Sequence, residues 1–251
     1  PCAPQASLPR GLPVFDRYSL GDLALQIRRP HPQRMPLRIL APAEPAVQAD
    51  GPSRAAYVAM LAGAIGLAVL VRATIVLSSD FPINDGGMFF AMVRDLQASH
   101  YALPAFTTYN SSDIPFAYPP LGLYLAGLID DATPVDLLTV FRILPMVLSS
   151  LMIVAFFAFA RRMLGSRPAV VTAVFVFGLL PATFQWMIMG GGLTRALGFL
   201  FAVLAIGQAH AMYTDRRPWR VPVVTVLASL VALSHIEMAW LTAFVSALLF
   251  A

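Results

Sequence analysis

Apolar runs long enough to cross a lipid bilayer recur along this chain, and they constrain its fold more than any other feature. One covers residues 57–77, and others follow from Leu137 to the end of the sequence. A helix of about 20 apolar residues spans the hydrocarbon core of a bilayer. Only 12% of the residues are charged, whereas a typical soluble domain has about 25%. We therefore expect an all-α, polytopic transmembrane helical bundle.

The N-terminal region has a different composition. Proline and arginine recur over residues 1–54 without a helical or strand period, and proline breaks helices. We expect a disordered tail there and a transmembrane domain over residues 55–251. The sequence begins with Pro1 and ends inside an apolar run, which predicts a fragment from the N-terminal side of a longer protein.

Arginines indicate which ends of the predicted spans face the cytoplasm. Arg54 precedes the first span, Arg161 and Arg162 follow a second one, and Arg217 follows a later one. The positive-inside rule places these ends, and the N-terminus, in the cytoplasm. Residues 79–136 then form a large first extracytoplasmic loop. Because the positive charge follows the spans, it indicates topology and no nucleic-acid partner.

The spans after this loop are predicted at residues 137–160, 168–187 and 196–213. The next apolar segment, 221–234, has only 14 residues, and another apolar run follows it. Two helices that meet near the outer face would fit this pattern, and so would one long broken span. We expect an integral protein of a bacterial or archaeal plasma membrane.

Two short helices are predicted inside the large loop. Apolar side chains between Met88 and Leu96 recur at helical spacing, which predicts a helix lying flat at the membrane interface. Asp95 is on the polar face of this helix, where we expect it to be solvated. A second helix is predicted to start at Pro119 and Pro120 and to run through Leu128, before a polar break at residues 130–136.

Three motifs occur in an order that resembles the GT-C superfamily of integral-membrane glycosyltransferases, most closely the protein-O-mannosyltransferase and aminoarabinose-transferase type. They are Asn84–Asp85 followed by the predicted interfacial helix, the proline pair within residues 118–125, and the span and basic end within residues 142–165. The resemblance covers roughly residues 57–215. It implies transfer of a sugar from a polyprenyl-phosphate donor to an acceptor at the outer face. The sugar and the acceptor are not specified by these motifs.

Asp85 is the candidate catalytic residue. Attack of an acceptor hydroxyl on an anomeric carbon needs a base, and a carboxylate within hydrogen-bond reach can serve. Gly86 and Gly87 follow where the family commonly has a glutamate after the aspartate, and they allow a ligand close to the backbone. In the alternative interpretation Asp85 only caps the following helix.

Arginine is the only cationic side chain for phosphate in this sequence, because all 17 basic residues are arginines. Arg195 follows three glycines at a predicted outer turn, where it would hold the lipid phosphate. In the alternative interpretation it is an interfacial arginine whose head group reaches toward water. The same two interpretations apply to Arg72, with the second favoured, either toward water or into the bundle interior.

The remaining candidate substrate-binding residues are Asn84, Tyr118, His235 and Glu237. Ionisable groups are costly within apolar runs and are often functional there. His235 and Glu237 are two positions apart, so a helix would not place them on one face. A loop could, and they would then form a structural pair, a phosphate contact or a metal contact. The metal ligands are unknown, although a divalent cation is one option for the cofactor.

Two other classes of function fit a polytopic chain. A transporter or lipid flippase would use the same outer-facing polar cluster, but its charges should lie near the bilayer midplane. The second is a non-catalytic membrane protein, either a scaffold or an inactive relative. The charges here gather at the ends of the predicted spans, which favours the glycosyltransferase. Its expected partners are the lipid bilayer and the lipid-linked sugar donor.

Overall fold

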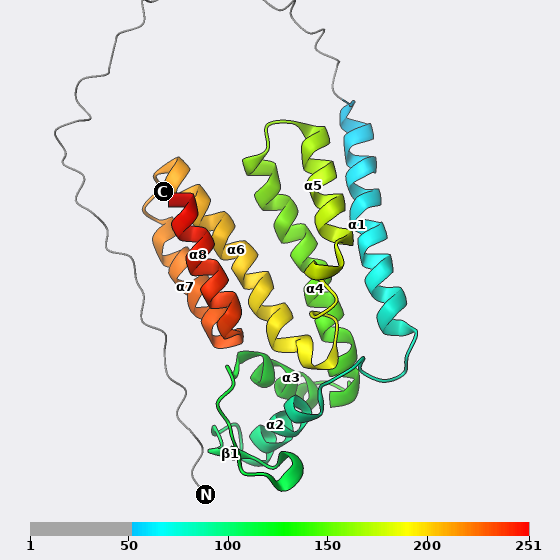
Figure 1. Ribbon diagram of the computed structural model, residues 1–251, viewed down its shortest axis with the longest axis vertical. Coiled ribbons are helices and arrows are strands. Elements are labelled where there is room, and N and C mark those ends of the chain that lie inside the picture. Colours follow the sequence, from blue (N-terminus) through cyan, green and yellow to red (C-terminus); the bar gives the residue numbers. More distant parts are fainter. Residues whose placement is uncertain (1–51, 251) are drawn as a thin grey trace, which may run out of the picture. The chain divides into compact units, whose positions relative to one another are not determined.

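The computed structural model describes residues 52–250 and shows a mainly helical protein (Figure 1). The predicted tail at residues 1–54 lies almost entirely outside this range. The predominance of helix confirms the all-α prediction at this level. The α-helices are α1 (Arg54–Leu77), α2 (Gly87–Ala98), α3 (Leu121–Ala132), α4 (Leu137–Met163), α5 (Arg167–Leu179), α6 (Leu193–Asp215), α7 (Arg220–Ser234) and α8 (Ile236–Phe250).

Three helices of the described region are long and apolar enough to cross a membrane. They are α1, α4 and the helical segment Gly190–Asp215, which includes α6. The helices α5, α7 and α8 are also apolar, but they have only 13, 15 and 15 residues. The long helices suggest a membrane protein, as the sequence predicts.

Side chains at three helix starts account for where these helices begin. Ser53 accepts a hydrogen bond from the backbone N–H of the first turn of α1, Asp136 does the same for α4, and Ser166 does so for α5. Such caps satisfy N–H groups that have no partner inside the helix. Asp136 therefore has a structural role.

The helix predicted at residues 168–187 ends early, which corrects the expectation of one continuous span. α5 stops at Leu179, and Leu180 is extended before the 3₁₀ turn η2 (Pro181–Thr183). Proline has no N–H and disfavours the helical conformation at the residue before it. Hydropathy alone does not detect this break, because the residues on both sides of Pro181 are apolar.

The helices α7 and α8 form a hairpin whose turn is a single residue, His235. His235 has an extended backbone, with φ −160° and ψ 124°. Val224 and Ser246, each eleven positions from His235, line the same cavity. The sequence allows either two helices that meet at a turn or one long broken span. The structure shows two helices that meet at a turn.

Seven of the eleven arginines of the described region gather at one end of the helices, called here the arginine-rich end. Arg162 at the end of α4 forms an ion pair of 3.2 Å with Asp215 at the end of α6. Arg167 at the start of α5 donates to the carbonyl of Pro52, just before α1. The arginines of this end are Arg54, Arg161, Arg162, Arg167, Arg216, Arg217 and Arg220.

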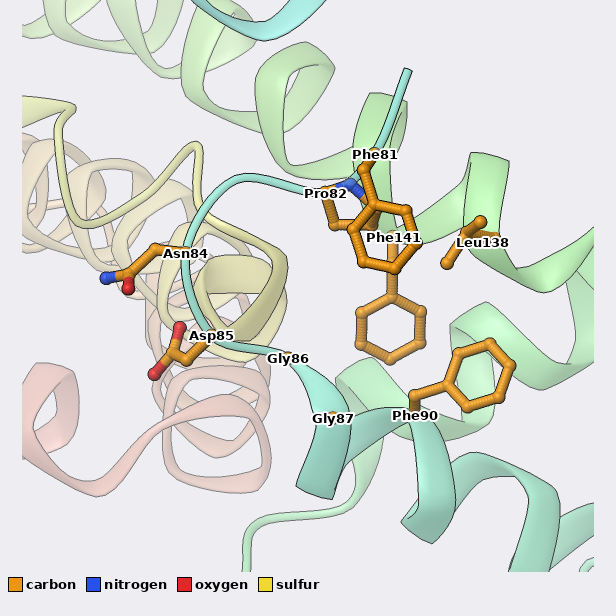
Figure 2. Close-up of a pocket in the computed structure, with 9 residues that line it drawn as sticks. All are labelled: Phe81, Pro82, Asn84, Asp85, Gly86, Gly87, Phe90, Leu138 and Phe141. Atoms are coloured by element: carbon orange, nitrogen blue, oxygen red, sulfur yellow. The ribbon is translucent and has the colours of Figure 1, made fainter. Parts of the chain in front are cut away.

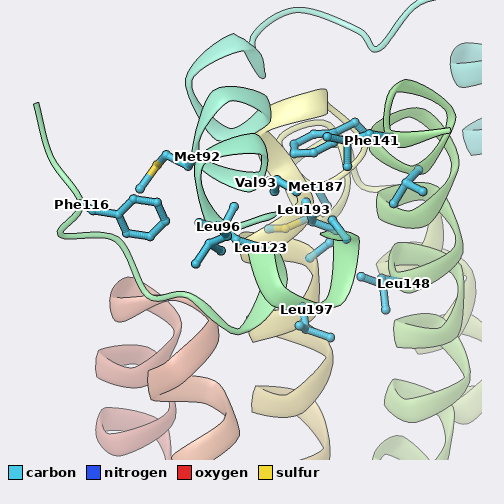
Figure 3. Packing of buried hydrophobic residues seen from close by; sticks show 14 residues of the cluster. Met92, Val93, Leu96, Phe116, Leu123, Phe141, Leu148, Met187, Leu193 and Leu197 are labelled. Atoms are coloured by element: carbon cyan, nitrogen blue, oxygen red, sulfur yellow. The ribbon is translucent and has the colours of Figure 1, made fainter. Parts of the chain in front are cut away.

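The opposite end, called here the loop end, carries α2 and α3 beneath the start of α6 and the turn between α7 and α8 (Figure 1). A core of buried side chains holds these helices in place (Figure 3). Met92, Val93 and Leu96 come from α2, Leu123 comes from α3, and Leu193 comes from α6. The buried face of α2 is therefore the apolar face that the helical spacing predicts.

The connection from α2 to α3 is ordered by polar contacts. It contains a two-residue antiparallel pair, β1 (Phe106–Thr107) with β2 (Ile114–Pro115), and the 3₁₀ turn η1 (Tyr109–Ser111). Asp95 accepts hydrogen bonds from the backbone N–H and the hydroxyl of Thr108, at 2.9 and 2.7 Å. Burial alone would raise the pKa of Asp95, but the bonds from Thr108 and Thr107 outweigh it and lower the pKa. Asp95 is partly exposed on the polar face of α2 and also anchors the connection.

The predicted polar break after the second short helix is also shorter than expected. α3 continues to Ala132 and includes Asp130 and Asp131. Arg94 and Gln97 of α2 donate to Asp130, and Gln97 also donates to Asp131. These partners fix the two carboxylates against α2, and the helix continues through them.

Candidate functional site

The segment around Asp85 lies against the turn that starts α6. The backbone N–H of Gly190 donates to the carbonyl of Ile83 at 3.0 Å, and that of Gly191 donates to the carbonyl of Asp85 at 2.8 Å. The turn is η3 (Gly190–Gly192), directly before α6. Two segments more than 100 positions apart are thus joined at the loop end.

Glycine is required where these two segments meet. A Cβ atom at Gly190 would lie 2.5 Å from the carbonyl oxygen of Asp85, and one at Gly191 would lie 2.6 Å from its carboxylate oxygen Oδ1. Gly86 has φ of 155°, a conformation that side-chain-bearing residues rarely adopt. The glycines on both sides of the contact therefore let Asp85 approach the backbone of η3.

The carboxylate of Asp85 does not cap α2. The N-cap residue of that helix is Gly86, and no side chain forms a capping hydrogen bond there. Asp85 is exposed, and its carboxylate has no hydrogen-bond or ion-pair partner among residues 52–250. The capping interpretation is therefore wrong, and the carboxylate is available to a ligand.

Asp85 and Arg195 line one pocket of about 140 Å³. Tyr118, Gly191 and Gly192 also line this pocket. Arg195 is in the first turn of α6, whose start has no side-chain cap and no acidic residue. The pocket thus combines one carboxylate, one guanidinium and the positive end of a helix dipole.

Arg195 joins the two other ionisable residues predicted for the site. Its Nε donates to Nε2 of His235 at 3.4 Å, and its terminal nitrogen forms an ion pair of 3.2 Å with Glu237. His235 is 3% exposed, and its ring meets that of Tyr118 edge to face at 6.0 Å. His235 and Glu237 are two positions apart, so one helix would not place them on the same face. His235 is in the turn between α7 and α8, and both side chains therefore reach Arg195.

The environment of His235 favours its neutral form. Burial lowers the pKa of His235, and the charge of Arg195 lowers it further. A neutral ring accepts at Nε2 when its proton is on Nδ1, which matches the donor role of Arg195. The side chain of Arg195 is 29% exposed. It is therefore held in place by the turn after α7 and by the start of α8, and it is not an arginine that extends freely toward water.

The described residues contain no group of three or more His, Cys, Asp or Glu side chains that could hold a metal ion. His235 and Glu237 both contact Arg195, which favours the structural interpretation of this pair over a metal contact. The divalent cation considered from the sequence has no ligand set in this part of the chain.

A second, apolar cavity lies on the other side of the Asp85 segment (Figure 2). Its volume is about 330 Å³, and Phe81, Phe90, Leu138 and Phe141 form much of its wall. Figure 2 shows the side chains of Asn84 and Asp85 pointing away from these phenylalanines. One short segment thus separates an apolar cavity from a charged pocket.

Three predicted site residues do not line the charged pocket: His235 and Glu237, which contact Arg195 from outside it, and Asn84. The amide of Asn84 contacts the sulfur of Met189 at 3.2 Å, and its backbone has φ of 61°. Three residues that the sequence analysis did not select do line the pocket, namely Phe89, Trp186 and Met189. Phe89 belongs to the predicted interfacial helix, but Trp186 and Met189 are in the irregular segment after α5 and show no periodic signal.

Comparison with protein-family models, with curated proteins and with solved structures found no match to this chain. The function is therefore inferred from the geometry of the site and from the motifs in the sequence.

Proposed function

We propose that this chain belongs to a membrane glycosyltransferase that moves a sugar from a polyprenyl-phosphate donor to an acceptor hydroxyl. One observation carries the proposal: Asp85 and Arg195, far apart in the sequence, line the same small pocket. A base and a phosphate-binding cation must lie within one substrate length of each other for this reaction.

The proposed step uses both side chains. The acceptor oxygen attacks the anomeric carbon, and a new C–O bond forms there. The bond between that carbon and the lipid phosphate oxygen breaks, and the electron pair leaves with the phosphate. Asp85 takes the proton of the hydroxyl. Arg195 and the N–H groups at the start of α6 stabilise the negative charge of the departing phosphate.

The two cavities beside the Asp85 segment support a lipid-linked donor. The charged pocket would take the phosphate and sugar, and the apolar cavity walled by Phe81, Phe90 and Phe141 would take the first part of the prenyl chain. A donor of this kind is charged at one end and apolar at the other, so it needs both surroundings within a few atoms.

The proposal places the loop end at the outer face of the membrane and the arginine-rich end in the cytoplasm. Its support is the uneven distribution of arginine together with the three long apolar helices. Arg195 and Arg94 at the loop end are paired with carboxylates, whereas Asp215 is the only acidic residue among the chain reversals of the arginine-rich end.

The test is Asp85→Asn in the full-length protein, assayed for sugar transfer from a membrane lipid extract. Asparagine keeps the shape but cannot take a proton, so we expect turnover to fall about 10²- to 10⁴-fold. Asp113→Asn is the matched control, because Asp113 is exposed in the same loop and does not line the pocket. Turnover like that of the wild type in a stably expressed Asp85→Asn protein would exclude Asp85 as the base.

A further inference from the structure

A third cavity lies between α4 and α6 at the arginine-rich end, remote from the proposed transfer site. Its volume is about 250 Å³. Arg161, Arg162 and Gln208 line its polar part, and Phe159, Val203 and Leu204 contribute to its apolar part. A cavity with cationic and apolar walls between two membrane-length helices matches one class of ligand, an amphipathic molecule with an anionic head.

Gln208 contributes a side-chain amide to the lining of this cavity. The guanidinium of Arg220 donates to the side-chain oxygen of Gln208. Since arginine can only donate, this contact fixes the amide so that its NH₂ group points elsewhere. That NH₂ group has no hydrogen-bond partner among residues 52–250, and it is not sealed from solvent. It can therefore donate to a ligand oxygen next to the two arginines.

The charge around the cavity is strongly unbalanced. Arg162 and Arg220 share one carboxylate, that of Asp215, at 3.2 and 3.3 Å. Arg161 has no ion-pair partner in the described region and lies over the ring of Phe157 at 5.7 Å. One carboxylate among three arginines leaves net positive charge, which an anion would neutralise.

We propose that this cavity binds the phosphate head group of an anionic phospholipid from the surrounding bilayer. Arg161 and Arg162 would contact the phosphate oxygens, Gln208 would donate to one of them, and the acyl chains would lie along the apolar wall. Basic pockets between transmembrane helices on the cytoplasmic side bind acidic lipids in this way. Lipid binding at this cavity requires that the protein is in a membrane, but it does not require the transferase activity. The lipid site and the proposed transferase function can therefore be disproved independently.

The test measures lipid binding to the full chain in detergent by native mass spectrometry, with phosphatidylglycerol and phosphatidylcholine as probes. We expect phosphatidylglycerol to bind at least about tenfold more tightly, and Arg161→Gln to weaken it by about tenfold, which corresponds to one charge-assisted hydrogen bond. Arg217→Gln removes the same charge from the same end but is outside the cavity, so it should bind like the wild type.

A second variant blocks the cavity without changing the charge. Ala158 lines the cavity and is exposed on α4, so Ala158→Phe should fold and should weaken phosphatidylglycerol binding as Arg161→Gln does. Equal loss in Arg217→Gln would overturn the proposal in favour of general charge attraction. The Tm of the protein is also compared with inorganic phosphate and with phosphatidylglycerol. An equal rise in Tm with both would overturn the lipid assignment. Unchanged phosphatidylglycerol binding by Ala158→Phe would overturn it as well.

Discussion

Arg72 shows how a charged residue can be accommodated inside an apolar helix bundle. It is 0% exposed. Its guanidinium donates to the hydroxyl of Ser149 at 2.9 Å and to the carbonyl of Gly178 at 2.7 Å, and it lies 4.4 Å from the ring centre of Phe184. Gly178 is in the last turn of α5, where carbonyls have no partner within the helix. Of the two locations considered for Arg72, the bundle interior is the one observed, and the residue caps α5 across the bundle.

Replacing Arg72 by methionine should destabilise the protein by about 3 kcal/mol, because buried hydrogen-bonding groups of Gly178 and Ser149 would lose their donor. Thermal unfolding in detergent measures this loss. Arg94→Met is the matched control: Arg94 is 52% exposed in its ion pair with Asp130, so its loss should cost less than about 1 kcal/mol. Equal changes in Tm would show that Arg72 contributes no more than a surface pair.

Tyr101 should titrate well above an ordinary tyrosine. Burial raises its pKa to about 12, helped by its hydrogen bond to Asp131. A raised folded-state pKa stabilises the protein fully below about pH 10, the unfolded value. This stabilisation is lost as the pH rises through about 12. Ultraviolet absorbance of phenolate, compared between wild type and Tyr101→Phe, gives the pKa of this residue.

Asp131→Asn separates the causes of this shift. It removes the carboxylate that accepts the phenol hydrogen bond, so the pKa of Tyr101 should fall toward 10. Asp113→Asn removes the same charge from the connection between α2 and α3 and should leave the pKa near 12. If the pKa of Tyr101 stayed near 12 in Asp131→Asn, burial alone would be the cause of the shift.

At the scale of elements, the contact between η3 and the Asp85 segment should be sensitive to one added methyl group. In Gly190→Ala the new Cβ would lie 2.5 Å from the carbonyl of Asp85 and 2.9 Å from Cβ of Pro82. The segment must then move, which we expect to cost about 2 kcal/mol. Gly66→Ala is the control, because no atom lies within 4 Å of its added Cβ in α1.

The two alanine substitutions should differ in sign. Gly66→Ala removes a flexible residue from a helix interior and should stabilise by about 0.5–1 kcal/mol. Thermal unfolding of both variants provides the comparison. If Gly190→Ala proved neutral, the close approach of the two segments would not be a constraint on the site.

The sequence predicts helices well where one period or one strong signal dominates. The helix around Met92 was found from its apolar spacing, and the start of α4 agrees with the prediction at residue 137. Hydropathy does not reveal the break at Pro181, because the residues on both sides of it are apolar. The extension of α3 through Asp131 depends on partners in α2, which no local pattern contains.

The sequence predicts which residues belong to the candidate site better than it predicts the contacts between them. Topology alone suggested that Asp85 and Arg195 belong to one face, and the structure places them in one pocket. The bonds from Arg195 to His235 and Glu237 depend on how α6 is rotated against the α7–α8 hairpin. Such a rotation follows from packing, so the sequence could not specify it. Asn84 was grouped with Asp85 by adjacency, although only Asp85 lines the charged pocket.

At the scale of the whole described region, the length of α4 bears on the membrane arrangement. Its 27 residues extend about 40 Å, more than the roughly 30 Å hydrocarbon core. If α4 crosses the bilayer, its ends must lie on opposite faces. The loop end and the arginine-rich end would then be in different compartments, and the proposed transfer pocket would open to only one of them.

Cysteine labelling in intact cells tests this arrangement. Cys2 is the only cysteine of the chain, so Cys2→Ser gives a background without thiols. Ala105→Cys adds one at the loop end, and Gly165→Cys adds one between α4 and α5; both positions are exposed. A membrane-impermeant maleimide should label position 105 in intact cells and position 165 only after permeabilisation, because the arginine-rich end is predicted to be cytoplasmic. Labelling of both positions from outside would show that α4 does not separate two compartments. The reverse pattern would place Asp85 and Arg195 in the cytoplasm, and the donor would then have to be supplied from that side.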